Sequence, residues 1–313
     1  MSGIEISIVI ATKNRPLILS ISVWKALSAS KGLPVEIIIV NDGDPLLIDF
    51  NDNMNIRVFH NPSNGVTSAR NYGVEQSRGK TLFIIDDDMW INQLGLIWIL
   101  ENFKKEENQK VVFNLNWEYP IELQKNLLNS KIGMYILASN YNTMWGRMHI
   151  AGAQPSSGLY KFSHIASCSL VMSRDIFNRI GGYNEDLIFQ GEDIELSNRI
   201  NNCQIPIYCV FDVTLFHNHS DRLDLNGYLD RESRGFQSQF AAEISGTIAK
   251  STNNYQGIRQ FLFRFAEFNE KLLIFIIDLT PSNKIFIKPT NTLIGILSSL
   301  QRYKQWRKVF DRV

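Results

Sequence analysis

The stretch Phe83-Ile84-Ile85-Asp86-Asp87-Asp88-Met89 decides the fold, because it joins a buried apolar run to three consecutive carboxylates. Residues 81–85 are predicted to form a core strand, so the carboxylates should emerge at its carboxyl end, where open α/β sheets bind their ligands. Like charges at a strand end repel one another and are best tolerated beside a cation or a charged ligand. The stretch therefore predicts a metal-diphosphate site. The structural alternative is that Asp88 caps a helix beginning near Asn92.

The residues around this stretch alternate between apolar strands and amphipathic helices. Strands are predicted at residues 5–11, 35–40, 56–59 and 81–85, and helices at residues 17–27 and 66–76. This alternation is typical of βαβ crossovers and of a parallel, doubly wound sheet. We therefore expect an α/β fold in which the polar residues that follow the strands meet along one edge of the sheet.

The rest of the chain predicts a longer α/β domain and a helical extension. Further strands are expected at 111–117, 165–172 and 205–210, and helices at 94–103, 174–180 and 192–200. From Asn226 onward the pattern is mostly helical. We expect one domain over residues 1–220 and a mainly helical region over residues 221–313.

Composition excludes several classes of protein. Lys and Arg number 32 and Asp and Glu 31, so no overall basic field favours a nucleic-acid partner. The cysteines (168, 203 and 209) are odd in number and lack CxxC spacing, which argues against a disulfide framework or a zinc site. No secretory signal or membrane-spanning run is evident. These features indicate a cytoplasmic location, and they leave the oligomeric state open.

Five segments, taken in order, resemble the motifs of the family 2 glycosyltransferases, which have the GT-A fold. They are residues 9–15 (VIATKNR, resembling VIPTYNR), 40–44 (VNDGD, resembling VDDGS), 64–73 (NGVTSARNYG), 83–89 (FIIDDDM, resembling the DxD segment), and 180–184 with 191–196 (IGGYN and GEDIEL). Asn41 and Asp44 depart from the second motif, so contacts to the donor base are expected to differ. The Q-x-x-R-W motif of processive members is missing, which indicates single-sugar transfer.

The resemblance implies a nucleotide-diphospho-sugar transferase that inverts the anomeric centre. Its donor would be a nucleotide-sugar, first of all a UDP-sugar, and its acceptor a hydroxyl of a surface glycan or of a lipid-linked precursor. A hexosyl or N-acetylhexosaminyl transfer is expected. Two alternative functions are also considered. A nucleotidyltransferase would more often carry a Gly-rich, basic loop, which residues 12–16 lack. A non-catalytic sugar-nucleotide-binding module would not need the retained acids.

The resemblance also implies a metal site at the three carboxylates. Asp86 and Asp88 resemble the DxD pair, with Asp88 as the direct ligand of Mn²⁺ or Mg²⁺ and Asp86 nearer the ribose, while Asp87 is expected on the opposite face. Such a cation offsets the charge of the departing diphosphate. His217 is slightly preferred to His219 as a further ligand, and a structural histidine is the alternative.

The donor is expected to be bound by residues of two loops and a helix: Thr12, Asn14, Arg15, Asp42 and Arg70, with Asp86 and Asp87. By resemblance, Asp42 accepts hydrogen bonds from the nucleotide base. The planar guanidinium of Arg70 can pair with the base or the diphosphate. Asp42 before a glycine is also ordinary turn chemistry, and Arg70 could instead be an exposed helical arginine.

Asp193 resembles the general base that takes the proton from the acceptor hydroxyl, and Glu192 would orient the acceptor or the base. The alternative is that both acids simply open a helix, where the macrodipole favours them. In the C-terminal region, four phenylalanines stand beside two arginines: Phe261, Phe263, Phe265 and Phe268 with Arg259 and Arg264. They could cover the acceptor site, rest on a membrane surface such as the inner face of the plasma membrane, or form core.

Overall fold

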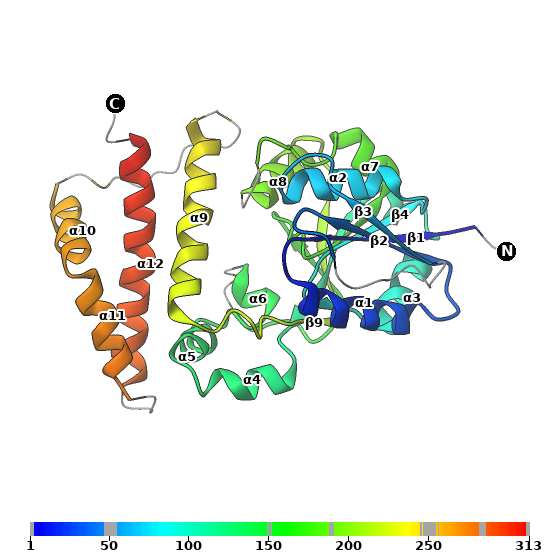
Figure 1. Ribbon diagram of the computed structural model, residues 1–313. Coiled ribbons are helices and arrows are strands. Elements are labelled where there is room, and N and C mark those ends of the chain that lie inside the picture. Colours follow the sequence, from blue (N-terminus) through cyan, green and yellow to red (C-terminus); the bar gives the residue numbers. More distant parts are fainter. Residues whose placement is uncertain are drawn as a thin grey trace. The chain divides into compact units, whose positions relative to one another are not determined.

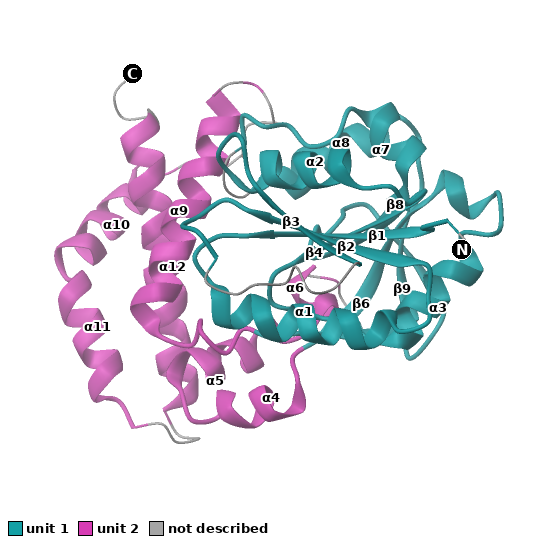
Figure 2. Ribbon diagram, turned by 45° about the vertical axis from the view of Figure 1, so that its right-hand side comes forward, with its two compact units in different colours: residues 1–118, 151–218 teal, residues 119–150, 219–313 magenta. Residues whose placement is uncertain are grey.

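The computed structural model describes residues 3–46, 55–148, 150, 152–187, 191–244, 246, 255, 257–281 and 286–310 (Figure 1). The chain forms two compact units, coloured separately in Figure 2. The first comprises Met1–Glu118 and Ala151–Asn218, and the second comprises Tyr119–Ile150 and His219–Val313. The three cysteines are free thiols.

The first unit is built on a mixed sheet whose strands run in the order β3-β2-β1-β4-β8-β6-β9-β5, with β7 also paired to β9. The strands are β1 (Ile6–Thr12), β2 (Val35–Asn41), β3 (Ile56–His60), β4 (Thr81–Asp86), β5 (Met89–Trp90), β6 (Val112–Glu118), β7 (Leu159–Phe162), β8 (Ser169–Ser173) and β9 (Ile207–His217). The pairs among β1 to β4 are all parallel, which confirms the predicted βαβ arrangement. β8 is antiparallel to both β4 and β6, and β9 is parallel to β6.

Helices cover both faces of this sheet (Figure 2). One face carries α1 (Pro16–Ser30) and α3 (Gln93–Asn102), and the other carries α2 (Val66–Gln76), α7 (Arg174–Ile180) and α8 (Glu192–Asn202). A 3₁₀ turn (Asn108–Lys110) precedes β6. Close packing of α2 on the sheet requires Gly73, because a Cβ there would lie 2.5 Å from Cγ1 of Val9.

The start of α3 excludes the alternative that Asp88 is the N-cap of this helix. The side chain of Asn92 accepts a hydrogen bond from the backbone N–H of Gly95 at 2.9 Å, so Asn92 is the N-cap. Asp88 is fully buried and does not cap the helix. The helix predicted at residues 174–180 is confirmed, with Ser173 as its cap and Gly181 in the left-handed conformation at its end.

The second unit is helical. It contains α4 (Ile121–Leu127), α5 (Lys131–Ala138), α6 (Met144–Arg147), α9 (Leu225–Ile244), α10 (Ile258–Phe268), α11 (Glu270–Leu279) and α12 (Ile287–Phe310). The long helix α12 packs against α5, α9, α10 and α11. No helix in the described part of the chain combines the length and the apolar character needed to cross a membrane.

Candidate active site

The ends of β1, β2 and β4 lie together at one edge of the sheet. In the parallel register Thr12 is opposite Asn41, and Ala11 is opposite Asp86. The backbone N–H of Asp42 donates to the carbonyl of Thr12 at 2.8 Å. The polar loops after these strands are therefore neighbours, as expected for a parallel sheet.

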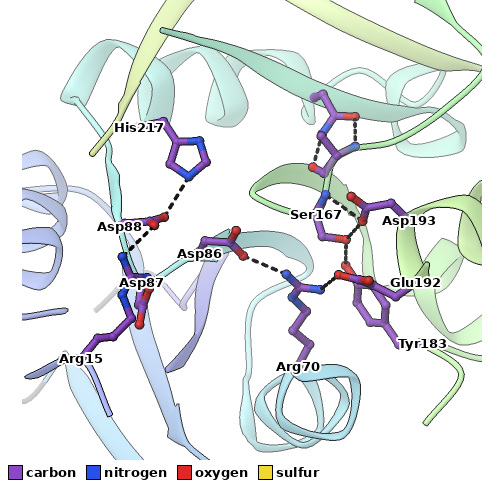
Figure 3. Close-up of polar contacts among 12 residues, drawn as sticks. Arg15, Arg70, Asp86, Asp87, Asp88, Ser167, Tyr183, Glu192, Asp193 and His217 are labelled. Carbon is purple, nitrogen blue, oxygen red and sulfur yellow. Dashed lines mark hydrogen bonds and ion pairs between the residues drawn. The ribbon is translucent and has the colours of Figure 1, made fainter. Parts of the chain in front are cut away.

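Arg15 forms ion pairs with two of the three carboxylates at the end of β4 (Figure 3). Its Nη1 pairs with Oδ1 of Asp87, and its Nη2 lies 3.0 Å from Oδ2 of Asp88. The hydroxyl of Thr12 donates to the second oxygen of Asp87 at 2.7 Å. Burial and the adjacent charge of Asp88 raise the pKa of Asp87 to about 7, whereas Arg15 and Thr12 act in the opposite direction. Asp87 thus shares its partner with Asp88, and the fork of Arg15 holds the pair in place.

Asp88 also contacts His217, the last residue of β9. Nε2 of His217 lies 2.9 Å from Oδ1 of Asp88, and both side chains are buried. The antiparallel pairing of Met89 with His217 sets this approach, and the ring of Trp117 packs edge-on against the imidazole at 4.8 Å. His219 belongs to the second unit, where its Nδ1 lies 2.6 Å from the hydroxyl of Tyr119.

Arg70 joins the end of β4 to the start of α8. Its Nη2 donates to Asp86 at 2.8 Å and its Nη1 to Glu192 at 3.0 Å. Its guanidinium carbon lies 5.3 Å from the ring centre of Tyr183. Arg70 is therefore a buried bridge between two acids, not an exposed helical arginine. Because each acid keeps a cationic partner, their mutual repulsion is offset.

The neighbouring Asn71 fixes the position of the Gly-Gly-Tyr turn. Its Oδ1 accepts from the backbone N–H of Tyr183 at 2.8 Å, and its Nδ2 donates to the carbonyl of the same residue at 2.9 Å. Two of the segments that resembled family motifs, 64–73 and 180–184, are thus bonded to each other. These bonds join α2 to the Gly-Gly-Tyr turn that follows α7.

Asp193 is held by a chain of hydroxyl groups. Ser167 donates to its Oδ1 with the backbone N–H, at 3.1 Å, and also with the hydroxyl. The hydroxyl of Tyr183 in turn donates to Ser167 Oγ at 2.8 Å. Burial and the neighbouring charge of Glu192 raise the pKa of Asp193 to about 7, while Arg70 and the Ser167 hydroxyl act in the opposite direction. A carboxyl group with such a pKa is about half ionised at pH 7, and its ionised form is basic enough to take a proton.

Asp42 already has protein partners on both carboxylate oxygens. Its Oδ1 accepts from Nδ2 of Asn61 at 2.6 Å and from the N–H of Gly65 at 3.0 Å, and its Oδ2 lies 2.9 Å from Nζ of Lys13. The carboxylate therefore ties the loop after β1 and the loop before α2 to the end of β2.

Asn14 organises the same edge through its backbone as well as its side chain. It adopts a left-handed conformation, with φ of 55°, and its Oδ1 accepts from the N–H of Asp44 at 2.8 Å. A Cβ at Gly43 would lie 2.0 Å from that oxygen, so only glycine fits between the two loops.

Several residues of the site were not expected from the sequence: Lys13, Asn61, Trp117, Ser167 and Tyr183. Tyr183 lies in the Gly-Gly-Tyr segment, whose match to a motif could have indicated it. Ser167 carries no comparable sequence signal, because its role depends on a contact with a residue 26 positions away.

The arrangement contains the donor set for a divalent cation. Asp88 and His217 offer an oxygen and a nitrogen 2.9 Å apart, and neighbouring ligands of an octahedral ion with bonds of about 2.1 Å are about 3.0 Å apart. A mixed carboxylate and imidazole set suits Mn²⁺ as well as Mg²⁺. The residues present therefore fit a divalent metal ion.

Comparison with solved structures identifies the fold as that of GT-A glycosyltransferases. A mannosyltransferase from Pyrobaculum calidifontis, solved with GDP-Man and Mn²⁺, is 11% identical, with a TM-score of 0.56 over 99% of this chain and 88% of that chain. GalNAc-T7, solved with UDP, GalNAc and Mn²⁺, is 14% identical, with a TM-score of 0.51 over 90% of this chain and 58% of that chain.

Sequence comparison places the chain within that class. The model of glycosyl transferase family 2 matches residues 7–181, and the chain belongs to this family. A hyaluronan synthase of Pasteurella multocida is 30% identical over 98 residues, which are 29% of this chain and 10% of the synthase. The chain thus matches only a small part of that relative and a little over half of GalNAc-T7.

Proposed function

We propose that the protein transfers one sugar, a hexose or an N-acetylhexosamine, from a nucleotide-sugar to a hydroxyl of a surface glycan or lipid-linked acceptor, with inversion. The observation that carries this proposal is the Arg70 bridge, which holds Glu192 beside Asp86 through bonds of 3.0 and 2.8 Å. A group suited to orient an acceptor is thereby fixed next to a group suited to bind the donor. We assign the reaction to residues 1–220 and treat residues 221–313 as an extension.

A divalent metal ion would be held by Asp88 and His217, with Asp86 directed to the ribose. Such an ion would offset the negative charge that develops on the departing nucleoside diphosphate. Support comes from the matched structures, which contain Mn²⁺ with UDP or GDP-Man. The imidazole nitrogen of His217 favours Mn²⁺ over Mg²⁺, because magnesium prefers oxygen ligands.

The remaining donor contacts would come from the loops at the same edge. Thr12 and Asn14 shape the first loop, and the guanidinium groups of Arg15 and Arg70 supply positive charge near the diphosphate. Asp42 would face the nucleotide base, and its bonds to Asn61 and Gly65 fix its orientation. A UDP-sugar is the donor that we expect first.

Asp193 would act as the general base. Among the described residues, both hydrogen bonds to its carboxyl end on Oδ1, which leaves Oδ2 to accept a proton. As that proton leaves the acceptor hydroxyl, its oxygen bonds to the anomeric carbon, and the bond from that carbon to the diphosphate oxygen breaks with its electron pair. Glu192 would orient the acceptor while Arg70 balances its charge.

Thermal unfolding with a panel of donors tests the proposal. A ligand that binds only the folded state raises its stability, by about 2.7 kcal/mol at a concentration of 100 Kd. We expect UDP-sugars with Mn²⁺ to raise Tm by several degrees, more than dTDP- or GDP-sugars do, and less without the metal. A rise in Tm accompanied by neither transfer nor hydrolysis of any donor would indicate a binding module instead.

The assignment of His217 makes a second prediction. His217→Ala should weaken Mn²⁺ binding by at least about tenfold more than His219→Ala, because Nε2 of His217 lies 2.9 Å from Oδ1 of Asp88, whereas Nδ1 of His219 is engaged by the hydroxyl of Tyr119. Calorimetric titration with MnCl₂ measures both constants, and urea unfolding checks that each variant is folded. Equal, small effects would leave both histidines with structural roles.

Ser167 is predicted to tune the base without taking part in bond making. Its hydroxyl bond lowers the pKa of Asp193. In Ser167→Ala, the pH below which kcat falls should therefore be about one unit higher than in the wild type. At pH 9 the variant should recover most of the wild-type kcat. Ser163→Ala is the matched control, because that exposed hydroxyl contacts His164. A uniform loss of rate at every pH would contradict this role.

A further inference from the structure

Helices α10 and α11 of the second unit each carry two apolar faces. The inner face packs on α12: the ring of Phe263 stacks on Tyr303, with centroids 5.2 Å apart, and Ile277 is fully buried. These contacts account for the attachment of α10 and α11 to the unit. They leave the second apolar face of each helix unexplained.

That second face is exposed and regular. In α10 it comprises residues 258, 261, 262, 265 and 268, and in α11 residues 272, 275, 276 and 279, all apolar. The spacing of three and four residues puts each set on one side of its helix. Phe261, Phe265 and Phe268 are exposed by 70%, 64% and 90%. A helix that faced only water would carry polar residues there, so this outer face indicates a binding surface.

The charges of the two helices are divided between the inner and outer sides. Glu267 pairs with Arg307 of α12 at 2.7 Å, and Glu270 pairs with Lys304 of α12 at 2.5 Å. The arginines at 259 and 264 and the lysine at 271 are exposed, against one exposed acid, at 278. The solvent-facing side is therefore both apolar and net positive.

We propose that the outer face of α10 and α11 binds the surface of an anionic phospholipid bilayer, with both helices lying in the plane of the interface. Phenylalanine, leucine and isoleucine side chains would enter the boundary between headgroups and acyl chains, and the basic residues would meet the lipid phosphates. A second copy of the chain fits this face less well. A twofold contact would bring the exposed basic residues of both copies (259, 264 and 271) into one interface with a single exposed acid, at 278, from each copy to offset them, and charged residues are depleted from the centres of such interfaces.

Vesicle flotation of the 313-residue chain tests this proposal without any substrate, so its outcome is independent of the proposed reaction. We expect the protein to float with vesicles of phosphatidylcholine and phosphatidylglycerol and to bind pure phosphatidylcholine at least about tenfold more weakly. Replacing Phe261, Phe265 and Phe268 together by serine should weaken binding by on the order of 100-fold. Arg259→Gln with Arg264→Gln should cost about 20-fold on anionic vesicles and little on neutral ones.

The control removes exposed apolar area elsewhere. Leu17→Ser with Trp24→Ser changes two exposed residues of α1 in the first unit and should leave flotation unchanged. Circular dichroism and urea unfolding check that every variant is folded. If wild-type protein fails to float, or if the serine variant floats equally well, the proposal is wrong. If the wild-type chain is instead a dimer by analytical ultracentrifugation, and the three serines make it monomeric without affecting vesicles, the face is a contact between copies.

Discussion

Asp193→Asn is expected to lower kcat by on the order of 10² to 10⁴, the usual cost of removing a general base. Asparagine keeps an oxygen that can accept both bonds from Ser167, but it cannot take a proton from the acceptor. Donor affinity should barely change, since Asp193 is proposed to touch the acceptor hydroxyl. Steady-state kinetics with both substrates varied, together with calorimetric titration of the donor, measures the two effects separately.

The pH dependence of the wild-type enzyme gives an independent check of that base. With a pKa of about 7, Asp193 is protonated at lower pH and cannot accept a proton. The logarithm of kcat should therefore rise by about one per pH unit below pH 7 and level off above it. The residual kcat of Asp193→Asn should not show this rise between low pH and pH 7.

Stability and a neighbouring acid provide the controls for Asp193. The raised pKa means that the folded state binds this proton more tightly than the unfolded state, so ionisation of Asp193 lowers the free energy of unfolding between about pH 4 and pH 7. Asp193→Asn, which avoids this cost, should be at least as stable as the wild type at pH 8.

Glu192→Gln should retain more activity than Asp193→Asn does. If Glu192→Gln is the inactive variant and Asp193→Asn is not, the base is Glu192.

Asp88→Asn should reduce metal-dependent transfer by on the order of 10³-fold or more. The amide has one acceptor oxygen and no charge, so it cannot serve both Arg15 and a cation beside His217. A chelator in excess should abolish the activity of the wild type in the same way. The measurements are sugar transfer as a function of Mn²⁺ concentration and Mn²⁺ affinity by calorimetry.

The control for Asp88 is Asp175→Asn, which removes an exposed carboxylate in the first turn of α7. This variant should match the wild type in rate and metal affinity, and it should lose at most about 1 kcal/mol of stability, because Asp175 stands in the first turn of the helix. Undiminished transfer by Asp88→Asn in the presence of excess chelator would overturn the metal assignment. A variant that loses activity but binds Mn²⁺ normally would instead assign Asp88 to the orientation of Arg15.

Local sequence patterns predicted most of the elements of the first unit. The helices expected at 66–76 and 174–180 have those bounds in the structure, and the strands expected at 35–40 and 81–85 are each longer by one residue. These elements are set by hydrophobic periodicity and by capping residues that lie within or next to them. The strand expected at 205–210 instead spans Ile207–His217, because pairing with β6 and β5 extends it beyond its apolar run.

The division of the three carboxylates could not be predicted in the same way. The resemblance to the DxD segment paired Asp86 with Asp88 and placed Asp87 on the opposite face, but β4 ends at Asp86 and the next two residues form a turn. Asp87 and Asp88 consequently share Arg15, and Asp86 meets Arg70. Their partners are 16 to 129 positions away in the chain, and periodicity carries no information at such separations.

By itself, the sequence determined that strands and helices alternate, that the strands end in polar residues, and that these ends share one edge, because parallel strands joined by crossovers point the same way. Only the tertiary structure decided which acid has which partner: Arg15 for Asp87 and Asp88, Arg70 for Asp86 and Glu192, and Ser167 for Asp193. The physical reason is that burial and nearby charge, which set the pKa of a carboxylate, depend on side chains that meet only after the chain has folded.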